Sequence, residues 1–289
     1  MSRAVLVDTT ICMACRGCQV ACKQWNDLPA EKTKFFAGSG GYENPPKLSA
    51  NSYTIVGYTE VEKGGLVKWV FTKRQCMQCL SPACMANCPV GAITRTAEGA
   101  VLNNQSKCIG CKTCEKACPF GTPAYDESKE IPVMKKCTFC ANRLAGDWFE
   151  KELNGKPMAE NDASRYTAKL STPICAKTCC SGALRYGDRN DLIAEAKRRL
   201  AAEPGKYVKH IYGEKEAGGT SWLYLAGIPF ADLGFPKDVK MTAYAQDKAT
   251  ALAAVPAPLV AAGTALSGLY WIAKRRNEMA RNKPGEPGK

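Results

Sequence analysis

The cysteines constrain this chain more than any other feature, because sixteen of the seventeen fall into four sets of four. One run, Cys108-x₂-Cys111-x₂-Cys114-x₃-Cys118-Pro119, has the spacing with which bacterial iron–sulfur proteins bind clusters, the fourth cysteine serving a second cluster. The other sets are Cys12-x₂-Cys15-x₂-Cys18-x₃-Cys22, Cys76-x₂-Cys79-x₄-Cys84-x₃-Cys88-Pro89, and the split set Cys137-x₂-Cys140 with Cys175-x₃-Cys179. The pattern predicts an internal repeat of [4Fe–4S] sites.

Disulfides and zinc are the alternatives for a cysteine-rich chain. Cysteines three residues apart on a tight turn rarely bridge each other, and an odd total leaves one unpaired. Zinc sites usually combine two C-x₂-C pairs, whereas three of the four sets here have a third cysteine soon after the pair. Iron–sulfur ligation is therefore favoured, and a zinc-bound structural or interaction module remains the alternative from a different functional class.

The formal charge of +13 invites a nucleic-acid-binding interpretation. Sixteen thiolates and four oxidised clusters would lower this charge to about +5, and no nucleic-acid-binding motif accompanies it. A single histidine, His210, excludes a two-histidine Rieske site and a bis-histidine haem. Dinucleotide, P-loop and c-type haem motifs are missing from the sequence, so we predict no catalytic residues in this chain.

Local patterns outside the cysteine sets predict a mixture of strands and helices. Strands are expected at Ala4–Asp8, Tyr53–Val61, Leu66–Lys73 and Ala100–Asn103, and a helix at Asp191–Glu203. Residues 142–173 are polar and predict a surface excursion. Residues 213–240 mix aromatic residues with Gly and Pro. They predict an irregular segment that covers either a partner or this protein's own core.

The C-terminal region predicts a transmembrane helix. Leu252–Ala273 carries no charged residue and is long enough to span a bilayer core of ~30 Å. Tyr270 and Trp271 are placed like an aromatic belt, and the basic run 274–276 follows at once. An Ala-rich helix buried in protein is the alternative.

The segment Cys18–Asp27, read with the four cysteine sets, resembles the iron–sulfur (beta) subunit of membrane-bound formate dehydrogenases. These belong to the four-[4Fe–4S] electron-transfer subunits of molybdopterin oxidoreductases. The resemblance runs from about Ala4 to the C-terminal helix. It implies an α+β fold of two ferredoxin-like modules with pseudo-twofold symmetry, with loop insertions. It also implies electron transfer from a molybdenum- or tungsten-containing formate-oxidising subunit to a membrane cytochrome b and quinone. Another molybdopterin reductase or a membrane hydrogenase is the alternative parent complex.

The resemblance further implies that the fourth cysteine of each set crosses to a neighbouring cluster. The implied ligand sets are Cys12, Cys15, Cys18 and Cys179; Cys137, Cys140, Cys175 and Cys22; Cys76, Cys79, Cys84 and Cys118; and Cys108, Cys111, Cys114 and Cys88. Lys23 and Cys180 stand where the other sets have proline. The three-residue gap from Cys175 favours Cys179 as the ligand, with the adjacent Cys180 as the alternative. If Cys179 is the ligand, Cys180 is predicted to be a small buried apolar residue. Lysines beside the sets, Lys107, Lys112, Lys116 and Lys136, could raise the potentials of particular clusters. They are expected to be mainly solvated surface charges.

The expected organisation follows from these assignments. The predicted divisions are 1–75, with the first cysteine set, an inserted loop and a hairpin; 76–136, the second ferredoxin-like module; 137–190, the split fourth set completing the first module; 191–250, a helix and wrapped extension; 251–274, a transmembrane helix; and 275–289, a basic tail. Basic residues near a span stay on the cytoplasmic side. The tail is therefore expected on the cytoplasmic side of the inner membrane, and the iron–sulfur domain in the periplasm. No apolar signal region precedes Cys12. The family resemblance implies export together with a catalytic partner that carries a twin-arginine signal.

Overall fold

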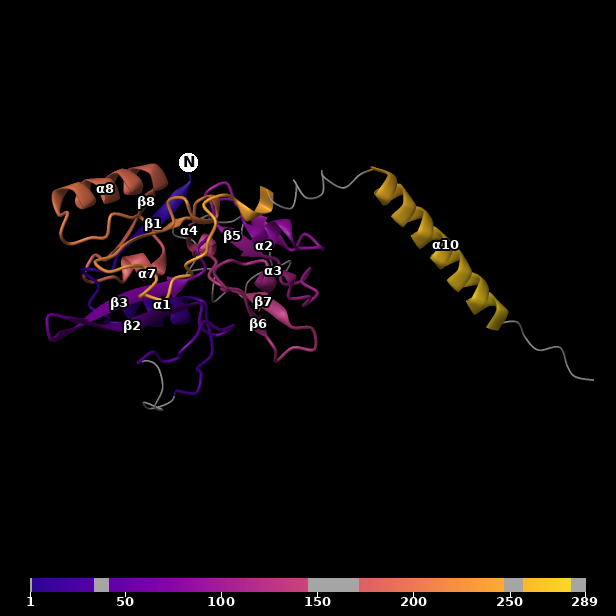
Figure 1. Ribbon diagram of the computed structural model, residues 1–289. Helices are drawn as coiled ribbons and strands as arrows, with labels where there is room; N and C mark the ends of the chain where they lie inside the picture. The colour runs from indigo at the N-terminus through magenta and orange to yellow at the C-terminus, as the bar shows by residue number, and fades with distance from the viewer. Residues whose placement is uncertain (1, 34–41, 145–171, 247–256, 282–289) are drawn as a thin grey trace, which may run out of the picture. The chain divides into compact units, whose positions relative to one another are not determined.

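The chain forms two compact units, Met1–Ala245 and Gln246–Lys289. The computed structural model describes residues 2–33, 42–144, 172–246 and 257–281 (Figure 1). All seventeen cysteines lie in the first unit, which is therefore the unit that positions any metal centre. Most of the predicted surface excursion, 142–173, lies outside the described residues.

A three-stranded sheet lies in the core of the first unit. Its strands are, in spatial order, β8 (Leu184–Asp188), β1 (Arg3–Asp8) and β9 (Trp222–Leu225). β1 pairs antiparallel with β8 and parallel with β9, so that Val5 lies opposite both Tyr186 and Trp222. Because β1 precedes the first cysteine set and β8 follows the last, this pairing brings the two ends of the cysteine-containing region together.

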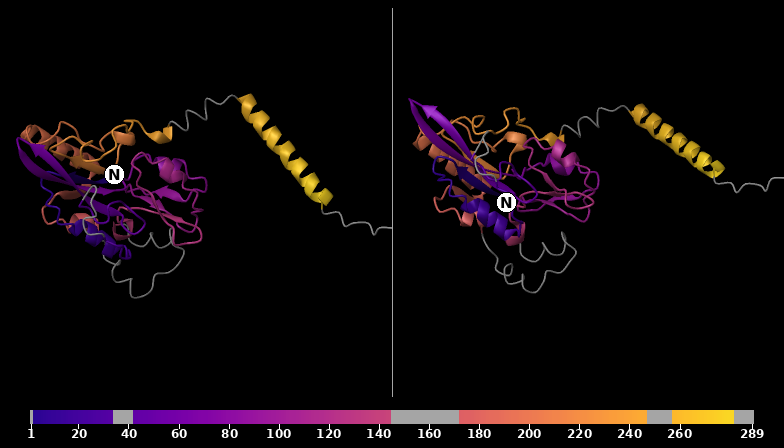
Figure 2. Two further views of the ribbon diagram at one scale, coloured as in Figure 1. Left: turned by 60° about the horizontal axis from the view of Figure 1, so that its bottom comes forward. Right: turned by 90° about the horizontal axis from the view of Figure 1, so that it is seen from below.

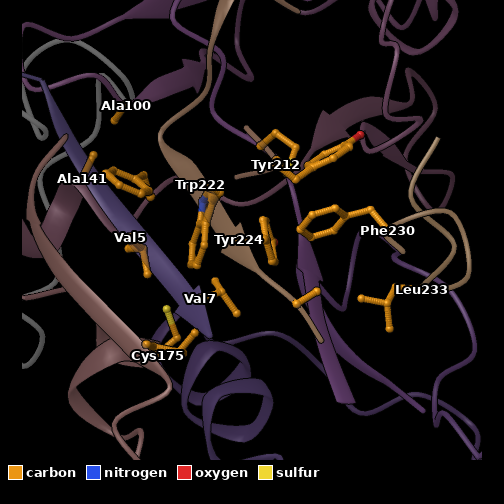
Figure 3. Packing of buried hydrophobic residues seen from close by; sticks show 14 of the residues in the cluster. Val5, Val7, Ala100, Ala141, Cys175, Tyr212, Trp222, Tyr224, Phe230 and Leu233 are labelled. Carbon is orange, nitrogen blue, oxygen red and sulfur yellow. The ribbon is translucent and has the colours of Figure 1, made fainter. Parts of the chain in front are cut away.

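Both faces of β1 are buried, which explains its unbroken apolar sequence. Side chains alternate across a strand. Val5 and Val7 point into the main core, where they pack in one cluster with Trp222 (Figure 3). Leu6 points to the opposite face and packs against Leu192 in a second cluster. The strand predicted at the start of the chain is thus confirmed and forms the middle of the sheet.

The helix predicted after the last cysteine set is α8 (Arg189–Ala202). It begins after Asp188, whose carboxylate caps it by accepting a hydrogen bond of 2.9 Å from the N–H two residues on. Leu192 and Ala196, four residues apart, are its buried residues and pack on the second face of the sheet. The helix therefore covers the sheet face that carries Leu6.

The predicted hairpin is formed by β2 (Thr54–Lys63) and β3 (Leu66–Gln75). Gly64 and Gly65 connect the strands with φ of 62° and 75°, as a two-residue type I′ turn requires. The tip of the hairpin projects from the rest of the unit (Figure 2), and Leu66 is 67% exposed there. The base of the hairpin runs directly into the second cysteine set.

Two smaller hairpins and several short helices complete the first unit. The hairpin strands are β4 (Ile93–Arg95) with β5 (Val101–Asn103) and β6 (Ala124–Asp126) with β7 (Val133–Lys135). The helices are α1 (Gly17–Trp25), α2 (Ala83–Ala86), α3 (Thr113–Lys116), α4 (Ala141–Leu144), α7 (Ile174–Lys177) and the 3₁₀ turn η1 (Glu216–Gly218). The strand predicted at Ala100–Asn103 is confirmed as β5. These short elements leave most of the cysteines on loops and single helical turns.

The segment 213–240 contributes more to the core than its composition predicts. It contains β9, a strand that the local sequence pattern does not predict, and Trp222 and Tyr224 are at most 1% exposed. Phe230 and Leu233 pack in the same cluster (Figure 3). Of the two expected roles, covering the protein's own core is confirmed for these residues.

The structure does not support the predicted transmembrane helix at 251–274 in the part of the chain that it describes. A helix is present there, α10 (Ala257–Arg281), but no described helix combines the length and apolar character that crossing a membrane requires. Weakly apolar Ala, Gly, Ser and Thr fill much of α10, and the basic run 274–276 lies within it. Residues 251–256 fall outside the described part. The expected topology stays a prediction.

Candidate metal centres

The four cysteine sets repeat in backbone conformation as well as in sequence. The residue before the second cysteine has a positive φ in every set: Ala14 (55°), Gln78 (52°), Gly110 (69°) and Phe139 (57°). A left-handed conformation costs a residue other than glycine roughly 1–2 kcal/mol, and three of these four are not glycine. Such strain persists only where the surroundings enforce it. The shared conformation therefore marks a loop shape that each of the four sites requires.

Each loop is followed by a helix that carries the third cysteine, namely α1, α2, α3 or α7. After α2, α3 and α7 the chain turns at a glycine with positive φ, whose N–H donates to the carbonyl of the set's fourth cysteine. These glycines are Gly91, Gly121 and Gly182. Helix α1 instead continues past Cys22 to Trp25. Lys23 suits that continuation, because proline inside a helix would remove a hydrogen bond.

Gly110 and Gly121 offer a matched test of these loops, since both have positive φ, 69° and 59°. A Cβ at Gly110 would lie 2.7 Å from the carbonyl oxygen of Pro132, whereas a Cβ at Gly121 would meet no atom within 4 Å. We expect Gly121→Ala to cost roughly 1 kcal/mol of unfolding free energy, and Gly110→Ala to cost more. Thermal unfolding of the metal-loaded protein measures both, and equal shifts in Tm would contradict the close approach at Gly110.

The first thiol group to consider contains Cys118 from the third set. Burial raises the pKa of Cys79 well above its usual value, and the neighbouring thiols of Cys76, Cys118 and Cys84 raise it further. Burial likewise raises the pKa of Cys84 to about 12, with Cys76 and Cys118 again among its neighbours. Cys118 therefore lies with the second set rather than with its own.

Cys22 leaves its set in the same way. Burial raises its pKa, and the thiols of Cys137 and Cys175 are among its neighbours. From the other side, Cys140 is buried and has Cys175, Cys22 and Cys137 beside it. The split set is thus completed by a cysteine from helix α1.

The two remaining groups contain the more exposed cysteines. Burial raises the pKa of Cys12, whose thiol neighbours include Cys179 and Cys15. Cys18 has these three thiols as neighbours. In the last group, Cys114 has Cys108 and Cys111 as neighbours. Cys88 packs in the same small apolar cluster as Cys108 and Cys114, a cluster that also includes Cys84.

The structure thus brings together the members of each ligand set that the resemblance implies. We name them the first group (Cys12, Cys15, Cys18, Cys179), the second group (Cys22, Cys137, Cys140, Cys175), the third group (Cys76, Cys79, Cys84, Cys118) and the fourth group (Cys88, Cys108, Cys111, Cys114). Ligation by these groups stays a prediction.

The surroundings of the thiols suit thiolate ligands of a cluster. The N–H of Ala92 donates to Cys88 Sγ at 3.3 Å, and the N–H of Phe139 donates to Cys137 Sγ at 3.4 Å. Hydrogen bonds to sulfur are among the features by which proteins set cluster potentials. Among the described residues, no three His, Cys, Asp or Glu side chains are close enough to hold a single metal ion. A four-iron core is wider than one ion, and groups of four thiols with N–H donors fit it.

Cys180 differs from its prediction as a buried apolar residue, because its side chain is exposed. Its Sγ lies 3.8 Å from Cys15 Sγ and 3.5 Å from Met13 Sδ. The residue follows the turn at Cys179, so it faces outward at the edge of the first group. Cys12 and Cys18 both have Cys179 as a neighbour, whereas of these two cysteines only Cys12 has Cys180 as a neighbour.

We therefore expect Cys180→Ala to retain all four clusters and Cys179→Ala to lose or convert one. Full occupancy corresponds to about sixteen iron atoms per chain, of which Cys179→Ala would lose up to about four. Iron analysis and low-temperature EPR of the anaerobically purified variants measure the difference. The reverse pattern would make Cys180 the ligand.

Two buried lysines belong to the surroundings of the thiols, and sequence reasoning misses their position. Lys136 is predicted at the surface but is 5% exposed, and Lys73, which lies in strand β3, is 2% exposed. Lys107 and Lys116 are exposed as expected. The only sequence signal for a buried lysine here is its position next to a cysteine set. That signal does not distinguish Lys136 from the exposed Lys107 and Lys116.

Comparison with known proteins agrees with this arrangement. Two family models described as 4Fe-4S dicluster domain match residues 11–92 and 67–151. Two such domains correspond to four [4Fe–4S] clusters. A protein from Nitratidesulfovibrio vulgaris is 37% identical over 286 residues, which cover 99% of this chain and 70% of that protein.

Relatives with descriptive names point to one class of complex. The nitrate-inducible formate dehydrogenase iron–sulfur subunit of Escherichia coli is 33% identical, over 82% of this chain and 74% of the relative. The hydrogenase-2 operon protein HybA of Escherichia coli O157:H7 is 31% identical, over 82% and 73% respectively. By its thiol groups, its dicluster domains and these relatives, the chain belongs to the family of formate dehydrogenase iron–sulfur subunits, which transfer electrons and are not themselves catalytic.

Proposed function

We propose that this chain holds four [4Fe–4S] clusters in a line and conducts electrons between two partner subunits. Each thiol group would hold one cluster, and each bound cluster would accept and release one electron at a time. The chain's own part is to hold the clusters, to place them near one another and to shield them from water. Crossing of the fourth cysteines supports this, because it ties each site to its neighbour.

The single observation that carries the proposal is the order of the thiol groups. Cys18 of the first group neighbours Cys175 of the second. Cys137 of the second group neighbours Cys76 of the third. Cys84 of the third group neighbours Cys114 of the fourth. These pairs of electrostatic neighbours connect the four groups in the order first, second, third and fourth.

Exposure supports the same order. Cys15 in the first group and Cys111 in the fourth are exposed, whereas every cysteine of the second group is buried. The two ends of the line therefore approach the protein surface, where partners could exchange electrons with it. The repeated loop conformation also supports two ferredoxin-like modules related by a pseudo-twofold axis, one holding the first and second groups and the other the third and fourth.

The proposed partners follow from the relatives. The formate dehydrogenase relatives suggest a molybdenum- or tungsten-containing subunit that oxidises formate at one end, and a membrane cytochrome b that passes electrons to quinone at the other. The similarity to HybA supports a second candidate, a hydrogenase complex in which hydrogen is the electron donor. The iron–sulfur chain does not select the substrate in either case.

The proposal is tested on the complex purified anaerobically with its native partners. We expect brown protein with about sixteen iron atoms in this chain, and cluster EPR signals that appear on addition of formate. Reduction by hydrogen instead would select the second candidate. Zinc without visible absorption would overturn the iron–sulfur proposal and favour a zinc-bound structural module.

A further inference from the structure

Lys73 and Lys136 are buried, and neither has an ion-pair partner in the part of the chain that the structure describes. Their exposed fractions are 2% and 5%, and within the described residues neither lies within ion-pair distance of a carboxylate. Burying a charge is costly unless something of opposite charge compensates it. The described carboxylates do not supply this compensation, and the cysteines near both lysines are the other groups that can carry negative charge there.

The surroundings of Lys73 point to the first and second groups. Its Nζ donates to Gln75 Oε1 at 2.7 Å and lies 4.2 Å from the centre of the Trp222 ring. Its positive charge favours the thiolate forms of cysteines in both groups, namely Cys18, Cys22, Cys137 and Cys175. Lys73 is thus held in place by a strand neighbour and an aromatic ring, close enough to both groups for its charge to act on their thiols.

Lys136 lies beside the second and third groups, as Lys73 lies beside the first and second. Its Nζ donates to the carbonyl oxygen of Val101 and, at 3.3 Å, to that of Cys137 in the second group. Its charge favours the thiolate forms of Cys84 and Cys79 in the third group. Lys136 therefore lies where the second and third groups meet.

We propose that Lys73 and Lys136 are the fixed counter-charges of the inner clusters and raise their reduction potentials. This inference rests on the proposed function. A [4Fe–4S]²⁺ core with four thiolates carries a charge of −2, and uptake of one electron makes it −3 with no bond formed or broken and no proton moved. The added negative charge is unfavourable in a buried site. An adjacent cation offsets it, so that the buried middle of the line accepts electrons more readily than burial alone would allow.

Removal of either charge tests the proposal. In Lys73→Met and Lys136→Met we expect the inner clusters to be harder to reduce by about tenfold in equilibrium constant, which is 59 mV for one electron. Potentiometric titration of the full complex with dithionite, followed by EPR, measures each cluster's potential. Lys73→Met should shift chiefly the cluster of the second group, to which three of the four cysteines influenced by Lys73 belong, and Lys136→Met chiefly that of the third. Lys73→Arg and Lys136→Arg should restore values close to the unmodified protein.

Lys112→Met is the matched control. Lys112 follows Cys111 directly, just as Lys136 precedes Cys137, but its side chain is 44% exposed and pairs with Glu127 at 2.6 Å. Solvent and salt screen such a charge, so its loss should leave the potentials within error. Four intact clusters with unshifted potentials in both buried-lysine variants would overturn the inference. So would an equal shift in Lys112→Met.

Iron analysis of each variant separates this inference from the proposed function. A chain without iron–sulfur clusters in the unmodified complex refutes the function itself. If Lys73→Met loses a cluster, Lys73→Gln, which retains a hydrogen-bond donor beside Gln75 without the charge, is titrated in its place. If a neutral variant of either lysine has full iron content and unchanged cluster potentials, that lysine is not a counter-charge of a cluster.

Discussion

Cys118→Ser should damage the cluster of the third group, to which Cys118 belongs. It should spare the cluster of the fourth group, which contains the other three cysteines of the Cys108–Cys118 run. The expected loss is up to about four of about sixteen iron atoms, or conversion to a three-iron form. The reason is the position of Cys118, whose thiol lies beside Cys76 and Cys79. Iron analysis and EPR of the purified variant measure it, because a three-iron cluster has a spectrum different from that of the four-iron form.

Cys88→Ser is the matched variant for this experiment. Cys88 precedes its Cys-Pro turn as Cys118 does, but it packs with Cys108 and Cys114 of the fourth group. The two variants should therefore damage different clusters. Cys118→Ser should damage that of the third group, and Cys88→Ser that of the fourth group. Damage confined to the local set in both variants would rule out the crossed arrangement, and so would four intact clusters in both.

How much of this arrangement is predictable depends on how local its causes are. The cysteine spacing predicts the loops, since each loop is determined by a few consecutive residues and recurs in all four sets. The hairpin at Gly64 and Gly65 and the helix capped by Asp188 are local in the same sense, and the sequence predicts both. Spacing alone does not predict that the fourth cysteines cross between sets. The family resemblance implies this crossing, and the structure places the thiols accordingly.

The features that sequence reasoning misses depend on contacts between distant segments. Trp222 lies in a strand because β9 pairs with β1 from the other end of the unit, and the surrounding Gly and Pro residues hide that strand. Lys73 belongs to a predicted strand, yet its burial depends on Trp222. Charge alone predicts a solvated lysine. Residue type assigns Cys180 to the interior, whereas the turn at Cys179 directs it outward.

The C-terminal helix is predictable in part. A helix is present at Ala257–Arg281, but among the described residues no helix has the length and apolar character that a membrane span requires. Residues 251–256, where the predicted span begins, lie outside the described part of the chain.

Breaking the line at its second group should stop electron flow through the chain. Cys140→Ser is the suitable change, because Cys140 is buried and its neighbouring thiols all belong to its own group. Changes in residues that only surround a metal site cost roughly 10–100-fold in activity, and loss of a ligand should cost at least as much in electron transfer from the donor substrate to quinone. Reduction of an artificial dye by the catalytic subunit alone should be unaffected.

The distribution of electrons in this variant tests the order of the groups. When the donor substrate is added, clusters on the side of the catalytic subunit should become reduced, while those beyond the damaged second group should stay oxidised. Dithionite, a small reductant that reaches the chain from solution, should reduce all the remaining clusters. Cys180→Ala, which removes an exposed thiol from the neighbouring first group, should conduct normally. If the donor substrate still reduces every remaining cluster in Cys140→Ser, the groups do not form a single line, because electrons then have a route around the second group.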